Sequence, residues 1–140
     1  MRTRSKILLA AMALLLLAGG AIAATGRDAI LAALLAEAKK ENPAFAGFSA
    51  ARGEAFYHAK HTGGHPQTPS CTTCHTEDPR NRGQTRAGKA IEPVAVSRTP
   101  TRFTDPEKVA KWFRRNCRSV LGRECTAAEK GDYITYLTNQ

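Results

Sequence analysis

The spacing of apolar residues along the first half of the chain predicts two helices. Between residues 27 and 40, isoleucine and leucine recur at helical intervals, and two lysines close the segment, where cations interact favourably with a helix dipole. Residues 51–61 again have helical character, with one glycine and two aromatic residues available for packing. The pair Gly63-Gly64 is expected to end this second helix.

Capping signals predict two further helices near the end of the chain. Thr104 is expected to cap a helix that runs to about Asn116, because proline suits the first turn and Glu107 completes a capping box. A second capping box opens at Thr126, and the apolar residues that follow it at helical spacing are expected to face the core. No alternating β pattern competes, so the predicted class is all-α.

The stretch from the Gly63-Gly64 pair to about Thr101 shows no sustained period of either kind. It is rich in glycine, proline, threonine and arginine, which favours loops. A structureless stretch of this length is unusual in a compact domain unless something other than its own backbone organises it. A large prosthetic group would do so.

Residues 1–23 have the features of a signal peptide. Three cations precede an apolar run over residues 7–18, and small residues at positions 21–23 suit a signal peptidase. The alternative is an uncleaved anchor, but the run is shorter than the roughly 20 apolar residues that span a bilayer. We therefore expect residues 24–140 to form one periplasmic domain that does not span the membrane and whose cysteines meet an oxidising compartment.

The segment Cys71-Thr72-Thr73-Cys74-His75 is the signature of covalent c-type haem attachment. Two thiols at this spacing add to the haem vinyl groups, and the adjacent histidine reaches the iron. A thioredoxin-like dithiol has the same CxxC spacing but requires an α/β domain, for which this chain offers no strands. A zinc site of all four cysteines is the other alternative, although Cys117 and Cys125 are eight residues apart rather than two to four.

The sixth position on the iron has no strong ligand in the expected place. Both methionines lie in the leader, and no histidine follows His75. The other histidines, His58, His61 and His65, precede His75 by 10 to 17 residues. The position would then be empty, filled by water, or taken by a weak donor such as asparagine or lysine, which leaves the iron approachable. A plain electron carrier with two histidine ligands remains the alternative.

Positive charge is concentrated in the second half of the chain. The formal net charge is +9, and twelve of the 21 Lys and Arg residues lie between residues 80 and 123, with only three acids. Arg82, Arg86 and Lys89 are the candidates for neutralising the haem propionates. Other cations would steer an acidic redox partner. Nucleic acid is a poor alternative because the chain is exported and its aromatic residues lack a stacking pattern.

The order and spacing of several motifs resemble the sphaeroides haem protein family. The matching segments are Thr68 to His75, Gly83-Gln84-Thr85-Arg86 with Gly88-Lys89, Arg102 to Asp105, Lys111-Trp112, and Arg115-Asn116-Cys117 through Gly122-Arg123 to Cys125. The resemblance implies a class I cytochrome c fold with an additional N-terminal helix, long haem-wrapping loops and one covalently attached haem c. It also implies His75 as the proximal ligand, Asn116 as the distal ligand and a Cys117–Cys125 disulfide.

The resemblance carries a functional expectation as well. An asparagine oxygen is a hard donor that holds ferric iron weakly and loses its hold on reduction, so the reduced protein is expected to bind a diatomic gas such as O2 or NO. Trp112 lies one turn before Asn116 and is expected in the pocket wall. A dihaem or membrane-associated cytochrome is the implied electron donor. The residues do not decide whether the bound gas is chemically converted.

Overall fold

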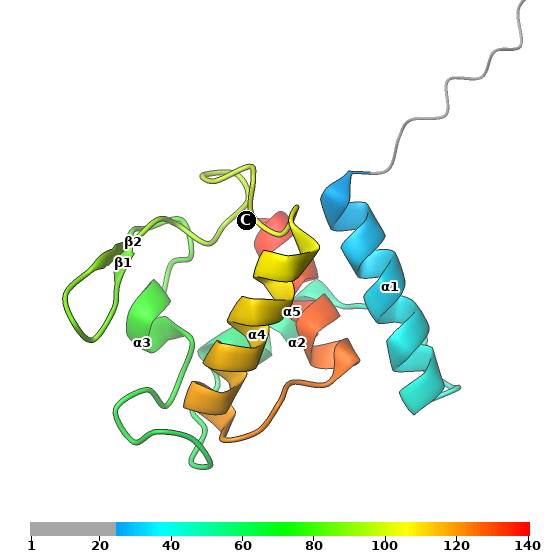
Figure 1. Ribbon diagram of the computed structural model, residues 1–140, viewed down its shortest axis with the longest axis horizontal. Helices are drawn as coiled ribbons and strands as arrows, with labels where there is room; N and C mark the ends of the chain where they lie inside the picture. The colour runs from blue at the N-terminus through cyan, green and yellow to red at the C-terminus, as the bar shows by residue number, and fades with distance from the viewer. Residues whose placement is uncertain (1–24) are drawn as a thin grey trace, which may run out of the picture.

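The computed structural model describes residues 25–140 and shows a helical protein with one short hairpin (Figure 1). The signal-peptide prediction for residues 1–23 lies outside the described part. No helix among residues 25–140 combines the length and the apolar character needed to cross a membrane. The elements are α1 (Gly26–Glu41), α2 (Ala50–His58), α3 (Thr72–His75), β1 (Gly83–Gln84), β2 (Ala90–Ile91), α4 (Pro106–Leu121) and α5 (Ala127–Thr138).

The all-α prediction is confirmed, with one small addition. Strands β1 and β2 form an antiparallel pair of two residues each, in which Gly83 lies opposite Ile91. Such a short pair leaves no alternating apolar pattern for sequence reasoning to detect. Figure 1 shows this hairpin and α1 on opposite sides of the molecule, with α4 and α5 between them.

Helix α1 begins at a capping box and packs against α5. The Thr25 hydroxyl accepts a hydrogen bond from the backbone N–H of Asp28, whose carboxylate accepts one from the backbone N–H of Thr25. Ile30, Leu34 and Ala38 form its buried stripe, and they belong to one cluster with residues of α5. The predicted helix at residues 27–40 therefore has nearly the observed bounds.

Helices α2 and α5 cross in close contact at Gly53. A Cβ atom placed on Gly53 would lie 2.0 Å from the backbone oxygen of Asp132, so only glycine permits this approach. Beside the crossing, Arg52 donates to both carboxylate oxygens of Asp132, at 2.7 and 2.9 Å. The two helices are thus joined by backbone contact and by a bidentate ion pair. Helix α2 ends at His58 rather than His61, because Ala59 already has extended backbone angles.

Helix α4 differs from its prediction at both ends. Its N-cap is Asp105, whose carboxylate accepts from the backbone N–H of Lys108, whereas the Thr104 hydroxyl donates to the carbonyl of Thr101. The helix also continues beyond Asn116 to Leu121 and ends at Gly122, which has φ of 73°. Asn116 therefore lies within the helix instead of capping it.

Candidate haem site

The CxxCH motif forms a single helical turn that is attached to the α2–α5 pair. Helix α3 follows Cys71 and ends at His75. The hydroxyl of Tyr57, which is fully buried on α2, lies 3.1 Å from the carbonyl oxygen of His75 and 2.8 Å from that of Thr76. Tyr57 itself packs against Tyr133 and Tyr136 of α5, with ring centroids 6.1 and 5.6 Å apart. The core thus fixes the position of the motif.

The protonation states of the motif suit haem attachment. Burial, and to a smaller extent the Arg102 guanidinium, lowers the pKa of the His75 imidazole to about 4. His75 is therefore neutral near pH 7, which is the form that binds a metal. Burial raises the pKa of the Cys71 thiol to about 12, which disfavours the thiolate needed by a zinc site or a redox dithiol. Cys71 and Cys74 are both free thiols. Two thiols and a neutral imidazole at this spacing fit a c-type haem.

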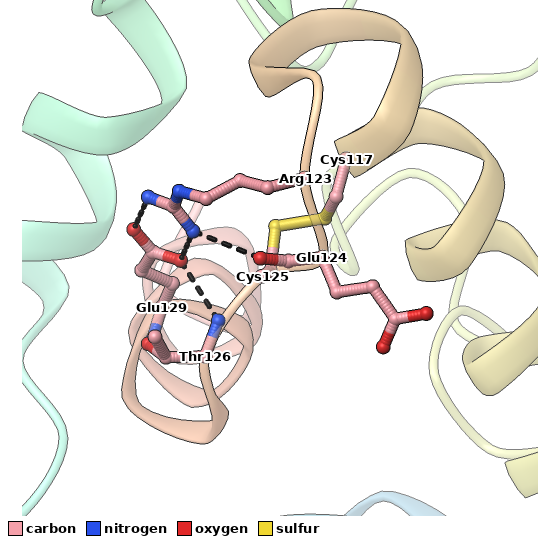
Figure 2. The surroundings of a disulfide bond; sticks show 6 residues. All are labelled: Cys117, Arg123, Glu124, Cys125, Thr126 and Glu129. Carbon is pink, nitrogen blue, oxygen red and sulfur yellow. Dashed lines mark hydrogen bonds and ion pairs between the residues drawn. A yellow bond between two sulfur atoms is a disulfide. The ribbon is translucent and has the colours of Figure 1, made fainter. Parts of the chain in front are cut away.

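The other two cysteines are joined in a disulfide at the end of α4 (Figure 2). Cys117 and Cys125 have Cα atoms 5.6 Å apart and are both buried. Figure 2 also shows the Arg123 guanidinium facing the Glu129 carboxylate, with N–O distances of 2.8 and 2.6 Å. Because this pair of cysteines is bonded, the four cysteines do not assemble into a zinc site, and no cluster of three or more metal-ligating side chains occurs within residues 25–140.

Asn116 and Trp112 occupy the same side of α4, one turn apart. Both side chains are exposed, whereas Phe113 is partly buried and Cys117 is buried. Trp112 is 50% exposed, and the guanidinium carbon of Arg115 lies 5.2 Å from its ring centroid. The helix therefore directs the amide and the indole away from the hydrophobic core.

The loop before the motif is bonded to α4 close to Asn116. The backbone N–H of His65 donates to the carbonyl of Ser119 at 2.7 Å, and the hydroxyls of Thr68 and Ser119 are 2.9 Å apart. Gly64 lies against the same turn, where a Cβ atom would meet the Ser119 carbonyl oxygen at 2.3 Å. This loop leads directly into Cys71, so the haem motif and the Asn116 end of α4 are held in a fixed relation.

Comparison with known proteins shows which family this chain belongs to. A family model described as a domain of unknown function, DUF1924, matches residues 43–137. The cytochrome c-type protein SHP of Cereibacter sphaeroides is 55% identical over 91 residues, which cover 65% of this chain and 70% of that protein. The chain belongs to the SHP family of c-type cytochromes.

Solved structures of two similar c-type cytochromes have the same fold. Oxidized SHP, described as an oxygen-binding cytochrome c, matches with a TM-score of 0.76 and 47% identity, over 83% of this chain and 98% of that chain. The solution structure of Methylophilus methylotrophus cytochrome c'', reported with insights into haem-ligand detachment, matches with a TM-score of 0.70 and 31% identity, over 81% and 93%. As a c-type cytochrome of this family, the chain carries one covalently attached haem c.

Two of the three cations predicted to meet the propionates in this SHP-family cytochrome lie beside the motif. Arg82 and Arg86 line a cavity of about 490 Å³ together with Cys74, but Lys89 does not. The Arg82 guanidinium already pairs with the carboxylate of Glu92. The structure thus brings Arg82 and Arg86 next to Cys74, while the propionate role of all three stays a prediction.

The side chains of the three remaining histidines make contacts with other residues of the protein. His58 Nδ1 lies 2.9 Å from a Glu77 carboxylate oxygen, and His65 Nδ1 accepts a hydrogen bond from the backbone N–H of Gln67 at 3.1 Å. The ring of His61 packs edge-on against Phe56 at 5.8 Å, and its Nε2 is covered by protein atoms and has no hydrogen-bond partner. Sequence spacing alone left these residues as rival ligands.

Two residues of the site were not identified from sequence. Tyr57 is a helix residue that sequence analysis assigned to packing, and its hydroxyl contact with the motif depends on the fold. Arg102 donates through Nε to the carbonyl of Pro93 at 3.0 Å and influences His75. Arg102 opens one of the segments that resemble the family, but the resemblance assigns it no role, and no local pattern links it to His75.

Proposed function

We propose that this cytochrome accepts an electron from a partner cytochrome and, once reduced, binds a diatomic gas such as O2 or NO at a position that Asn116 vacates. When bound through Cys71, Cys74 and His75, haem c would supply an iron centre that accepts one electron and that can bind a diatomic gas. The predicted leader would place this function in the periplasm. The relative described as oxygen-binding supports the gas ligand, and the cytochrome c'' structure reported with haem-ligand detachment supports a ligand that leaves.

The observation that carries the proposal is that the residues offer one strong iron ligand, at the CxxCH motif, and only a weak candidate for the opposite side of the haem. His75 is neutral and anchored through Tyr57, so it is suited to a permanent ligand. No histidine or methionine follows it in the chain. The earlier histidines are hydrogen-bonded to other residues or covered by protein atoms. The exposed amide of Asn116, on the helix bonded to the motif loop, is the candidate for the opposite side.

The chemistry of an asparagine amide explains release on reduction. Its oxygen is a hard, neutral donor that suits the ferric state better than the softer ferrous state. Once free, the same amide has an NH2 group that can donate a hydrogen bond to an incoming gas. One side chain can therefore close the site in the oxidised protein and stabilise a gas in the reduced protein.

The substitution Asn116→His tests this role. An imidazole nitrogen is a stronger ligand than an amide oxygen, so the variant is expected to become low-spin and to lose CO binding after reduction with dithionite. Optical spectra of the oxidised, reduced and CO-treated protein measure both effects. Asn81→His, on an exposed loop residue, is the matched control and should keep the wild-type spectra. A wild type that is low-spin in both states, or an Asn116→His variant that still binds CO, would show the proposal to be wrong.

A further inference from the structure

A row of cations runs along α4 on the side opposite its buried residues. Successive members are three or four residues apart, which places them on one face of a helix about 15 Å long between the first and the last. All four side chains are exposed, whereas Cys117 and Val120 on the other side are buried. We call this row the cationic stripe; its members are Lys108, Lys111, Arg115 and Arg118.

The centre of the cationic stripe has no neutralising partner. Its ends are paired, Lys108 with Asp105 at 3.6 Å and Arg118 with Glu124 at 3.0 Å. Within residues 25–140, no carboxylate lies within 4.0 Å of the Lys111 ammonium or the Arg115 guanidinium. The only acid in α4 is in its first turn. Two adjacent charges are therefore available to a carboxylate from another molecule.

Trp112 connects the stripe to the candidate haem site. On the helix surface its position falls between Arg115 and Asn116. The Lys111 ammonium lies 5.8 Å and the Arg115 guanidinium carbon 5.2 Å from the indole ring centroid. Tryptophan and arginine are the residue types that contribute most to binding at protein interfaces. An anion bound by Lys111 and Arg115 would therefore lie on the helix face next to the one that carries Asn116.

We propose that the cationic stripe is the docking surface for an acidic protein that donates electrons to this cytochrome. The inference rests on the proposed function, because it assumes that the site is reduced by a protein partner. A partner face rich in Asp and Glu would be attracted to Lys111 and Arg115 and would gain apolar contact with Trp112. The half-exposed indole beside these two cations favours a protein face, because tryptophan and arginine contribute most to binding at protein interfaces.

The first test measures electron entry from an acidic probe. Flavodoxin hydroquinone is mixed with the oxidised cytochrome in a stopped-flow instrument, and the second-order rate constant is recorded against ionic strength. The double variant Lys111→Glu with Arg115→Glu is expected to lower the rate at low salt by about tenfold, with the difference shrinking at high salt. The control Lys39→Glu with Lys40→Glu changes the net charge equally on exposed residues of α1 and should have a much smaller effect.

A second measurement reports docking without electron transfer. Oxidised flavodoxin is titrated into the 15N-labelled wild-type cytochrome, and the backbone amide shifts of α4 are expected to change while those of α1 stay constant. Equal slowing by both double variants, or shift changes away from α4, would overturn the docking surface. Binding to phosphatidylglycerol vesicles in the absence of any flavodoxin binding would overturn it as well. CO spectra of the dithionite-reduced variants should match the wild type, and a wild type that fails to bind CO contradicts the proposed function instead.

Discussion

Removing the Cys117–Cys125 disulfide should destabilise the protein by a calculable amount. The two cysteines are separated by eight residues, so the bond closes a short loop in the unfolded chain. In the chain-entropy model a loop of this size corresponds to about 2.5 kcal/mol at 25 °C. For a domain of this size, such a loss lowers Tm by about 10 °C. The perturbation is the double variant Cys117→Ala with Cys125→Ala, which leaves the haem-binding thiols intact.

Guanidinium chloride unfolding, followed by circular dichroism, measures the free-energy change. The wild type treated with a thiol reductant is the internal control, because reduction opens the loop without removing the buried sulfur atoms. Both samples should lose about 2.5 kcal/mol relative to the oxidised wild type. If the reduced wild type is as stable as the oxidised form while the double variant is destabilised, the effect comes from side-chain packing, and the loop-entropy reasoning is refuted.

Two further predictions concern residues around the same core. Burial would raise the pKa of Glu129, but hydrogen bonds from its arginine partner and from the helix N-cap outweigh burial and lower it. Glu129→Gln should therefore lower the free energy of unfolding by about 1 kcal/mol at pH 7, measured by urea unfolding. This difference should fade as the pH falls below the ordinary carboxyl pKa and through the lowered pKa of Glu129. A constant difference down to acid pH would contradict the assignment. Gly53→Ala places a Cβ 2.0 Å from the Asp132 oxygen and should cost about 3 kcal/mol in the same assay. Ala51→Gly, exposed on the same helix, should cost only about 1 kcal/mol, and equal losses would argue against the close helix crossing.

The elements with local signals were predicted well. The capping box at Thr126 is present as predicted, because both of its hydrogen bonds lie within four consecutive residues. The end of α4 was predicted wrongly at Asn116, since asparagine often follows a helix, and the true stop is the left-handed Gly122. The N-cap of α4 was predicted one residue too early, because Thr104 and Asp105 are both good caps. Only the fold shows that the Thr104 hydroxyl donates to the carbonyl of Thr101 instead.

The residues of the candidate haem site also differ in how far a local sequence signal predicts them. Cys71, Cys74 and His75 carry their chemistry within five residues, so the haem cofactor could be predicted from their spacing. The contact between Tyr57 and the His75 carbonyl joins residues 18 positions apart, and no short motif encodes it. The ligand role expected of Asn116 came from family resemblance, because an asparagine in a helix gives no chemical signal of its own. Trp112 was placed in the pocket wall from its position one turn before Asn116, and both roles stay predictions.

The crossing of α2 and α5 has a consequence for the order of assembly. Arg52 and Asp132 are 80 positions apart in the chain, and α5 is the last helix to be synthesised. The thiols of Cys71 and Cys74 are made well before the segment that closes the α2–α5 pair behind them. In a chain that has not yet closed this helix pair, both thiols would be accessible, whereas in the folded protein Cys71 is partly buried. The topology thus leaves an interval in which covalent attachment can precede closure of the core.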